Sequence, residues 1–323
     1  MSNARDFASR VPVDGALSNR NVIVNGRFDV WQRSTGPVTN SGYTTVDRWR
    51  FPASGITSEQ VSNDRDLSIP YALKVTADGT GYGITQTRIE DVRTLSGKDA
   101  TFSIWVKSPT TGAFRFFIEQ NFGSGGSSTV SILDNASQFS IASANTWEQF
   151  TVTVTMPSIS GKTLGTAHHV SLGIGANSGT ANRVMYYSEA QLEVGDTVTP
   201  FEHPRSYSDE LARCQRYYEI GVVFGQYKGV DDTGGWAHYK VTKRANPSIS
   251  IFPPDNSASN YGYYYSTISS DRGNRLINEI NPSTWFVGQV DYTAGFYAIM
   301  GAFTPASDND ATWVANYRAD AEL

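Results

Sequence analysis

The sequence contains a single cysteine, Cys214, so an intrachain disulfide is excluded. Only 18% of the residues are charged, and Lys and Arg are scattered, so the basic stripe typical of nucleic-acid-binding proteins is missing. No apolar run reaches the roughly eighteen residues of a membrane-spanning helix, and residues 1–10 lack the apolar core of a signal peptide. These absences predict a soluble protein that is made in the cytoplasm, binds no nucleic acid and inserts into no membrane.

Recognisable catalytic motifs are also missing. The four histidines show no zinc-binding spacing, and neither a nucleophile elbow nor a phosphate-binding loop occurs. Two carboxylate pairs, Asp29 with Asp47 and Glu90 with Asp91, resemble a glycosidase pair on paper, but each fits a turn residue or a strand-end ion pair better. The sequence therefore predicts no enzyme and no cofactor. A structural Ca²⁺ ion would have to use residues such as Asp29 or Glu189, without a ligand-loop signature.

Short alternating segments make up most of the chain. Between residues 71 and 192 they follow one another with Gly, Asp and Asn turns and no helical crossover, which predicts an antiparallel β-sandwich of the jelly-roll type. Residues 99–107 alternate most clearly and place Phe102, Ile104 and Val106 on the face opposite Trp105. Residues 22–31 begin as an apolar run that breaks at Asn25-Gly26, after which Phe28 and Val30 are predicted to point inward.

Residues 191–218 form the joint between two β-rich halves. A strand and a proline-containing loop lead to a helix, for which Ser206 supplies the N-cap. Tyr207, Leu211, Cys214 and Tyr218 recur at helical spacing and predict an apolar stripe that joins the halves. The expected organisation is an arm at 1–20, a jelly roll at 21–200, a linker with the helix at 201–219 and a smaller β-domain at 220–323.

Two groups of aromatic residues are predicted to lie outside the cores. Trp105 faces away from its apolar neighbours, so it is a candidate platform on which the apolar face of a sugar ring stacks. Consecutive tyrosines on one strand of the second domain point to both faces, which predicts a subunit interface or a second aromatic layer. These tyrosines are Tyr261, Tyr263, Tyr264 and Tyr265.

Three stretches of the chain carry a family resemblance. They are residues 21–49 (NVIVNGRFDVWQR, then YTTVDRW), residues 191–218 (QLEVGDTVTPFE, then ELARCQRYY) and residues 313–323, which end in ADAEL. In this order and at comparable separations they resemble tail-fibre and related virion surface proteins of tailed bacteriophages.

The resemblance implies a virion protein with a jelly-roll domain similar to carbohydrate-binding modules. It implies a tail fibre or receptor-binding subunit.

 In that family the subunits form homotrimers, the N-terminal arm docks on other virion proteins, and the β-domains contact host surface glycans. A head fibre or capsid decoration subunit is the alternative within the virion. A polysaccharide-degrading tailspike is a further alternative, although this chain lacks the turn-by-turn repeats of a β-helix.

Overall fold

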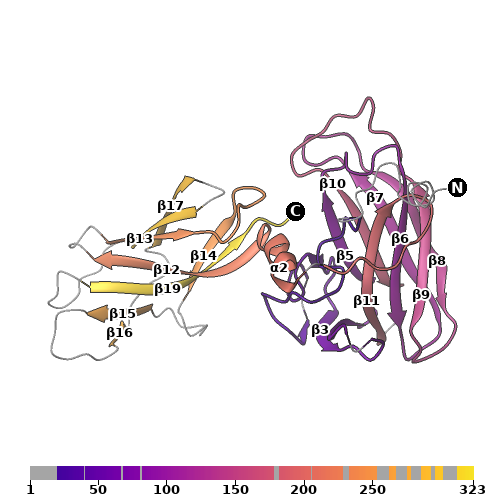
Figure 1. Ribbon diagram of the computed structural model, residues 1–323, viewed down its shortest axis with the longest axis horizontal. Helices are drawn as coiled ribbons and strands as arrows, with labels where there is room; N and C mark the ends of the chain where they lie inside the picture. Colours follow the sequence, from indigo (N-terminus) through magenta and orange to yellow (C-terminus); the bar gives the residue numbers. More distant parts are fainter. Residues whose placement is uncertain are drawn as a thin grey trace, which may run out of the picture. The chain divides into compact units, whose positions relative to one another are not determined.

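The computed structural model describes residues 20–323 apart from 40, 67, 81, 178–181, 205, 228–232, 253–261, 267–274, 278–284, 292–294 and 301–310. The chain divides into two compact units, residues 1–210 together with Leu323, and residues 211–322. Apart from the helix α2 (Tyr207–Gln215), the named elements of both units are β-strands (Figure 1). Within the described ranges, no helix has the length and apolar character needed to span a membrane.

The first unit is a jelly-roll β-sandwich of two antiparallel sheets (Figure 1). In spatial order, the six-stranded sheet consists of β1 (Val38–Thr39), β3 (Ile56–Ser62), β4 (Tyr71–Ala77), β11 (Arg183–Val194), β6 (Asp99–Lys107) and β9 (Glu148–Thr155). The five-stranded sheet consists of β2 (Trp49–Arg50), β5 (Gly83–Glu90), β10 (His169–Ala176), β7 (Gly112–Asn121) and β8 (Val130–Ile141).

The core lies between the two sheets and follows from strand alternation. Successive side chains of a strand point to opposite faces, so every second residue turns inward. On β6 these residues are Phe102, Ile104 and Val106, all buried, as the sequence predicts. Phe102 stacks on Phe116 of the facing sheet with ring centroids 5.0 Å apart, so the two layers interlock through aromatic rings.

Residues 22–31 contain no strand, and a turn spans residues 24–27, where the sequence predicts a break at Asn25-Gly26. Asn25 and Phe28 adopt left-handed backbone conformations, with φ of 58° and 60°. The side-chain oxygen of Asn25 accepts hydrogen bonds from the main-chain N–H groups of Asp29 (3.0 Å) and Val30 (3.1 Å). An asparagine that bonds to its own following backbone offers the chain an alternative to a sheet ladder. Phe28 and Val30 are nevertheless buried.

The second unit is built on one eight-stranded antiparallel sheet. Its strands in spatial order are β16 (Arg275–Ile277), β15 (Gly262–Ser266), β19 (Ala311–Asp320), β12 (Tyr218–Tyr227), β13 (Thr233–His238), β18 (Gly295–Met300) and β17 (Trp285–Asp291), while β14 (Ser248–Phe252) also pairs with β19. This is the smaller β-domain that the sequence predicts.

A buried charge pair lies in the second unit. The Lys243 Nζ and Glu219 Oε2 atoms are 2.5 Å apart, and both side chains are fully buried. Nζ also donates to the carbonyl oxygen of Gln215 (2.6 Å), and the Tyr317 hydroxyl donates to Glu219 Oε1. Burial lowers the pKa of Lys243, while its hydrogen bond to Glu219 opposes that shift. Both members of the buried pair thus have further hydrogen bonds. The pair links strand β12 to the segment after β13.

The helix α2 departs from its predicted stripe. Ser206 caps it, since its hydroxyl accepts from the N–H of Asp209 (3.1 Å), and Cys214 is buried as expected. Tyr207, however, is 56% exposed at the first turn. Tyr218 is buried but lies on β12, because the helix ends at Gln215 and a bond from the N–H of Tyr217 to the Cys214 carbonyl (2.9 Å) closes its last turn.

Leu211, the centre of that stripe, is only half-buried. The boundary between the two units falls inside α2, between Glu210 and Leu211. The continuous apolar stripe over three turns is therefore wrong, because the helix is shorter than the pattern and two of its predicted members, Tyr207 and Leu211, are not buried.

Candidate functional site

Trp105 lies on the outer face of the six-stranded sheet and is half-buried there. Tyr186 and Trp147 lie near it: Tyr186 is opposite Lys107 in the ladder between β11 and β6, and Trp147 directly precedes β9. Residues directly opposite one another on neighbouring strands share a face. The fold thus brings three aromatic residues to the face on which the sequence places only Trp105.

Cations already cover these rings. The guanidinium of Arg65 lies 4.6 Å from the centre of the Trp105 ring. The ammonium of Lys107 lies 4.8 Å from the Tyr186 ring centre and 5.1 Å from that of Trp147. Such contacts are cation–π interactions, and each one occupies part of a face that a sugar ring would otherwise use.

Each of these cations also has a carboxylate partner. Arg65 pairs with Glu189, and Lys107 Nζ lies 2.6 Å from Asp64 Oδ2. The Trp147 indole N–H donates to the other oxygen of Asp64 (2.7 Å). Hydrogen bonding to Lys107 is the main cause that lowers the pKa of Asp64. The polar groups around Trp105 therefore form a network whose charges are matched.

The QLE…TPFE motif lies further along the same face and has a structural use. The Gln191 side chain is buried, donates to Glu193 Oε1 (3.0 Å) and accepts from the main-chain N–H of Glu202 (2.7 Å). Glu202 in turn accepts from the N–H of Asn21 (2.8 Å). The motif thus holds two segments against the sandwich, the segment after β11 and the backbone at Asn21.

The outer face of the five-stranded sheet carries a row of residues that crosses all five strands. The register places Arg50 opposite Gln86, Gln86 opposite Gly173, Gly173 opposite Phe117 and Phe117 opposite Asp134. Their neighbours along β10 and β7, such as Leu172 and Phe116, belong to the core. The row therefore lies on the side away from the core.

Phe117 rests on the bare backbone of Gly173. A Cβ atom at Gly173 would lie 2.2 Å from the Phe117 ring, so no other residue fits there without displacing the ring. Tyr82, just before β5, is 43% exposed, and the Arg115 guanidinium lies 4.1 Å from its ring centre and 5.9 Å from that of Phe117. Two aromatic rings therefore flank one arginine on this face.

A second row lies beside the first. Ser171 is opposite Arg88 on one side and Glu119 on the other. Arg115 forms a two-pronged ion pair with Asp134, with N–O distances of 2.8 and 2.7 Å. Aromatic, cationic, anionic and hydroxyl groups are thus gathered within two neighbouring rows of one sheet.

Sequence reasoning missed this face, although one signal for it exists. In residues 112–121 Arg115, Phe117 and Glu119 alternate with the apolar Phe114, Phe116 and Ile118, so the strand reads as aromatic on both faces. Which strands lie beside it depends on the topology, and alternation within a strand contains no information about that.

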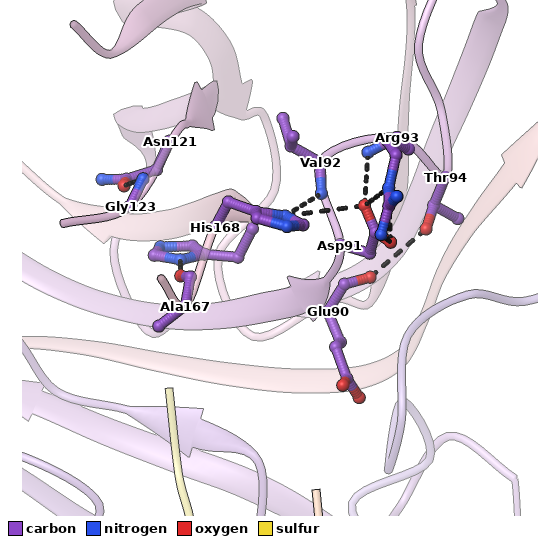
Figure 2. A network of polar contacts seen from close by, with 10 residues as sticks. Glu90, Asp91, Val92, Arg93, Thr94, Asn121, Gly123, Ala167 and His168 are labelled. Atoms are coloured by element: carbon purple, nitrogen blue, oxygen red, sulfur yellow. Dashed lines mark hydrogen bonds and ion pairs between the residues drawn. The ribbon is translucent and has the colours of Figure 1, made fainter. Parts of the chain in front are cut away.

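The carboxylate pairs singled out in the sequence are engaged in local contacts. Figure 2 shows Asp91 between Arg93 and His168: Arg93 Nη2 lies 2.5 Å from Asp91 Oδ2, and His168 Nδ1 lies 3.5 Å from Oδ1. The hydrogen bond from Arg93 is the main cause that lowers the pKa of Asp91. The main-chain oxygen of Glu90 accepts from the Thr94 hydroxyl (3.2 Å). These contacts close the turn after β5.

The other pair is likewise occupied. Asp47 is buried, and its Oδ1 lies 3.0 Å from Arg33 Nη1, while Asp29 Oδ2 lies 3.0 Å from Arg27 Nε. Burial raises the pKa of Asp29, and Arg27 opposes that shift. Among the described residues, no group of three or more His, Cys, Asp or Glu side chains is placed to hold a metal ion. A calcium ion at Asp29 or Glu189 stays a hypothesis.

The predicted interface tyrosines lie in the second unit. Tyr263, Tyr264 and Tyr265 are on β15, where Tyr264 is opposite Trp313 and Tyr263 opposite Val314 of β19. Tyr261 lies outside the described residues, as do residues 1–19 of the predicted arm at 1–20. Their role in a subunit interface stays a prediction.

Comparison with known proteins gives no family. No protein-family model matches the chain, and no curated protein matches it. Among solved structures, the chain is similar to the CBM22-2 xylan-binding domain from Paenibacillus barcinonensis Xyn10C, with 13% identity, a TM-score of 0.35 and coverage of 46% of this chain and 92% of the other. A structure described as "CBM4 structure and function" gives 19% identity, a TM-score of 0.35 and coverage of 53% and 98%.

A structure described as a sugar binding protein from Bacteroides thetaiotaomicron is also similar. It gives 15% identity, a TM-score of 0.35 and coverage of 54% of this chain and 100% of the other. Similarity this distant says nothing about the ligand of the present chain.

Proposed function

We propose that the first unit binds saccharides on the outer face of the five-stranded sheet. The observation that carries the proposal is the row from Arg50 to Asp134, in which Phe117 lies on glycine backbone and polar side chains flank it. Sugar rings stack their apolar faces on aromatic rings, while side-chain donors and acceptors bind the hydroxyl groups. The exposed ring of Tyr82 adds a second stacking surface.

Trp105 is the competing position for the same function. Its aromatic neighbours Tyr186 and Trp147 support a platform on the six-stranded sheet. Arg65 and Lys107 cover these rings and have carboxylate partners, as Arg115 does beside Tyr82, so the cations do not separate the two positions. Exposure favours Tyr82, whose ring is 43% exposed whereas Trp105 is half-buried. In either position the role is binding, without a catalytic step.

Three single variants test where a saccharide binds. Tyr82→Ala is expected to weaken binding to a glycan recognised by the parent protein by about three- to tenfold, the effect of losing one stacked ring. Trp105→Ala is expected to leave that affinity unchanged. Tyr71→Ala is the matched control, because Tyr71 is similarly exposed at 39% but lies at the start of β4. A glycan array followed by calorimetric titration makes the measurement.

The opposite pattern of affinities would place the saccharide site on the six-stranded sheet. If Trp105→Ala weakens binding and Tyr82→Ala does not, the platform lies on the six-stranded sheet. If no variant alters binding, or the parent binds no glycan on the array, the proposal of a saccharide site on this unit is wrong.

We further propose that the chain is a surface protein of a bacteriophage virion, as a tail fibre or receptor-binding subunit that attaches to host glycans. The support is the resemblance of residues 21–49, 191–218 and 313–323 to such proteins. The proposed assembly is a homotrimer in which the tyrosines of β15 contact a second copy. A head fibre or decoration subunit is the alternative, and a polysaccharide-degrading tailspike is a weaker one.

Deleting residues 1–20 tests the virion role. If this segment is the docking arm, the truncated protein is expected to fold, with an unfolding midpoint close to that of the full chain, and to be missing from assembled particles. Electron microscopy of particles made with the parent and the truncated protein checks both the presence and the location of the subunit. Particles that still carry a full complement of the truncated protein would refute an arm at this end.

A further inference from the structure

The strand β9 is an unprotected edge of the six-stranded sheet. It is the last strand of that sheet, it is eight residues long, and its register with β6 runs without an irregularity. The other sheet edges of the first unit, as far as the structure describes them, are short or irregular: β1 and β2 are two residues long, and the register of β8 with β7 shifts. Short edges, irregular edges, proline and lysine all hinder pairing with another chain, and β9 contains neither proline nor lysine.

The hydrogen bonds from β9 to β6 use every second residue. The main-chain N–H of Met156 donates to the carbonyl oxygen of Lys98 (2.9 Å), and these residues continue the register in which Val154 is opposite Ala100. Bonded and non-bonded pairs alternate along an antiparallel ladder, so the even-numbered residues of β9 are the ones that bond to β6. The main-chain groups that point away from β6, and that have no main-chain partner in the described part of the chain, belong to Gln149, Thr151, Thr153 and Thr155.

The apolar side chains at this edge are incompletely covered. Phe150 and Val154 of β9 pack against the core but are only half-buried, and so is Leu133 of β8. The strand β8 lies beside β9 (Figure 1), and the rings of Phe139 and Phe150 contact each other with centroids 5.6 Å apart. A strand added to β9 would therefore remove more of Phe150 and Val154 from water, in addition to bonding to the main-chain groups of the edge.

The strand is complementary to a second copy of itself. Two antiparallel β9 strands related by a two-fold axis at Val152 would place Thr151 of each copy opposite Thr153 of the other. Gln149 of each copy would then be opposite Thr155 of the other. All of these residues direct their main-chain groups away from β6, so each N–H of one edge meets a carbonyl oxygen of the other.

The side chains suit the same register. Phe150 of each copy would be opposite Val154 of the other, so apolar residues meet on the inner face and threonines on the outer face. No charged residue lies between 149 and 155, so like charges do not repel each other across the axis. We propose that two copies of this chain associate through antiparallel pairing of their β9 strands, which joins two six-stranded sheets into one. Because the pairing is two-fold, the assembly contains an even number of chains, whether or not β15 makes a further contact.

A proline at the edge tests the pairing. Sedimentation equilibrium of the full chain is expected to give an even multiple of the mass of one chain. Thr151→Pro removes a main-chain N–H that does not bond to β6, so the variant is expected to fold, with an unchanged far-UV circular dichroism spectrum, and to have half the mass of the parent assembly. Thr151→Val is the matched control, because it changes the side chain and keeps the N–H, and it is expected to keep the mass of the parent.

Amide hydrogen exchange in the parent protein tests the same edge without a variant. The amides of residues 149, 151, 153 and 155 are expected to exchange about tenfold or more slowly in concentrated than in dilute protein, because only the assembly gives them acceptors. The amides of β9 that bond to β6 are expected to exchange slowly at both concentrations. This measurement decides the question even if Thr151→Pro fails to fold.

Several results would overturn the proposal. These are a monomer or an odd number of chains at high concentration, a folded Thr151→Pro variant with the mass of the parent assembly, or equally fast exchange of the outward amides at both concentrations. Protection of these amides that appears only in a complex with a different protein would assign the edge to that partner, and would overturn the pairing of two copies as well.

Discussion

The outer faces of the two sheets in the first unit both combine aromatic rings with cations, yet their charges are arranged differently. On the six-stranded sheet Arg65 pairs with Glu189, Lys107 with Asp64 and Lys74 with Glu59. On the five-stranded sheet Arg115 pairs with Asp134, whereas Arg50 donates to the amide oxygen of Gln86 (3.1 Å) and Arg88 to the main-chain oxygen of Leu323. All three cations of the first face thus have carboxylate side chains as partners, whereas Arg50 of the second face is bonded to an uncharged side chain.

The difference indicates what each set of polar residues does. A matched network ties loops to a sheet, as Asp64 and Arg65 do for the segment between β3 and β4. An arginine that is half-buried and bonded to a side-chain amide, as Arg50 is, contributes less to the stability of the folded chain and can also bind a ligand. Aromatic residues alone would not have distinguished the two faces.

The largest expected effect is on the matched face. Glu189→Gln leaves the Arg65 guanidinium without its carboxylate, and the side chains of the pair are only 6% and 17% exposed. The variant is expected to lose about 1–3 kcal/mol of the free energy of unfolding, measured by urea denaturation. The matched control is Glu119→Gln on the other face, which is expected to change stability by less than about 0.5 kcal/mol. Equal losses in the two variants would remove the distinction.

A smaller effect is expected in the acid dependence of stability. The pKa of Asp64 is lowered in the folded protein, chiefly by its hydrogen bond to Lys107. Its contribution is therefore fully present above the unfolded pKa of about 3.9 and is lost as pH falls through the folded pKa. Because Asp64 is largely exposed, the effect is modest.

Asp64→Asn should accordingly make the fall in stability below about pH 4 shallower. Urea midpoints recorded between neutral pH and pH 3 check this expectation. Asp134→Asn is the companion variant, because Arg115 lowers the pKa of Asp134 in the same way on the other face. An unchanged acid limb in Asp64→Asn would mean that the Lys107 pair does not hold the loop.

Much of the fold could be predicted from alternation. The strand at residues 99–107 has the predicted bounds. The strands β3 and β8 were missed. β3 contains ITSEQVS and β8 contains LDNASQ, so polar residues interrupt the apolar period even though both strands pair along much of their length. Pairing with the neighbouring strands stabilises β3 and β8, although their own sequences do not alternate as strands usually do.

The candidate site was less predictable for a different reason. The outward direction of Trp105 follows from one strand, and it lies on the outer face as expected. The row from Arg50 to Asp134 joins five strands that are far apart in sequence, and only their register brings those residues together. No local pattern shows that Arg65 would cover Trp105 or that Arg50 would bond to Gln86.

The most direct test measures stability and ligand affinity together in two variants, Glu189→Gln and Arg50→Gln. The account predicts a crossed result. Glu189→Gln loses stability and keeps the affinity of the parent for its glycan, while Arg50→Gln keeps stability and loses affinity by about tenfold. If one variant loses both stability and affinity, or if Arg50→Gln binds the ligand like the parent, the two faces do not have the separate roles of stabilising the fold and binding the ligand.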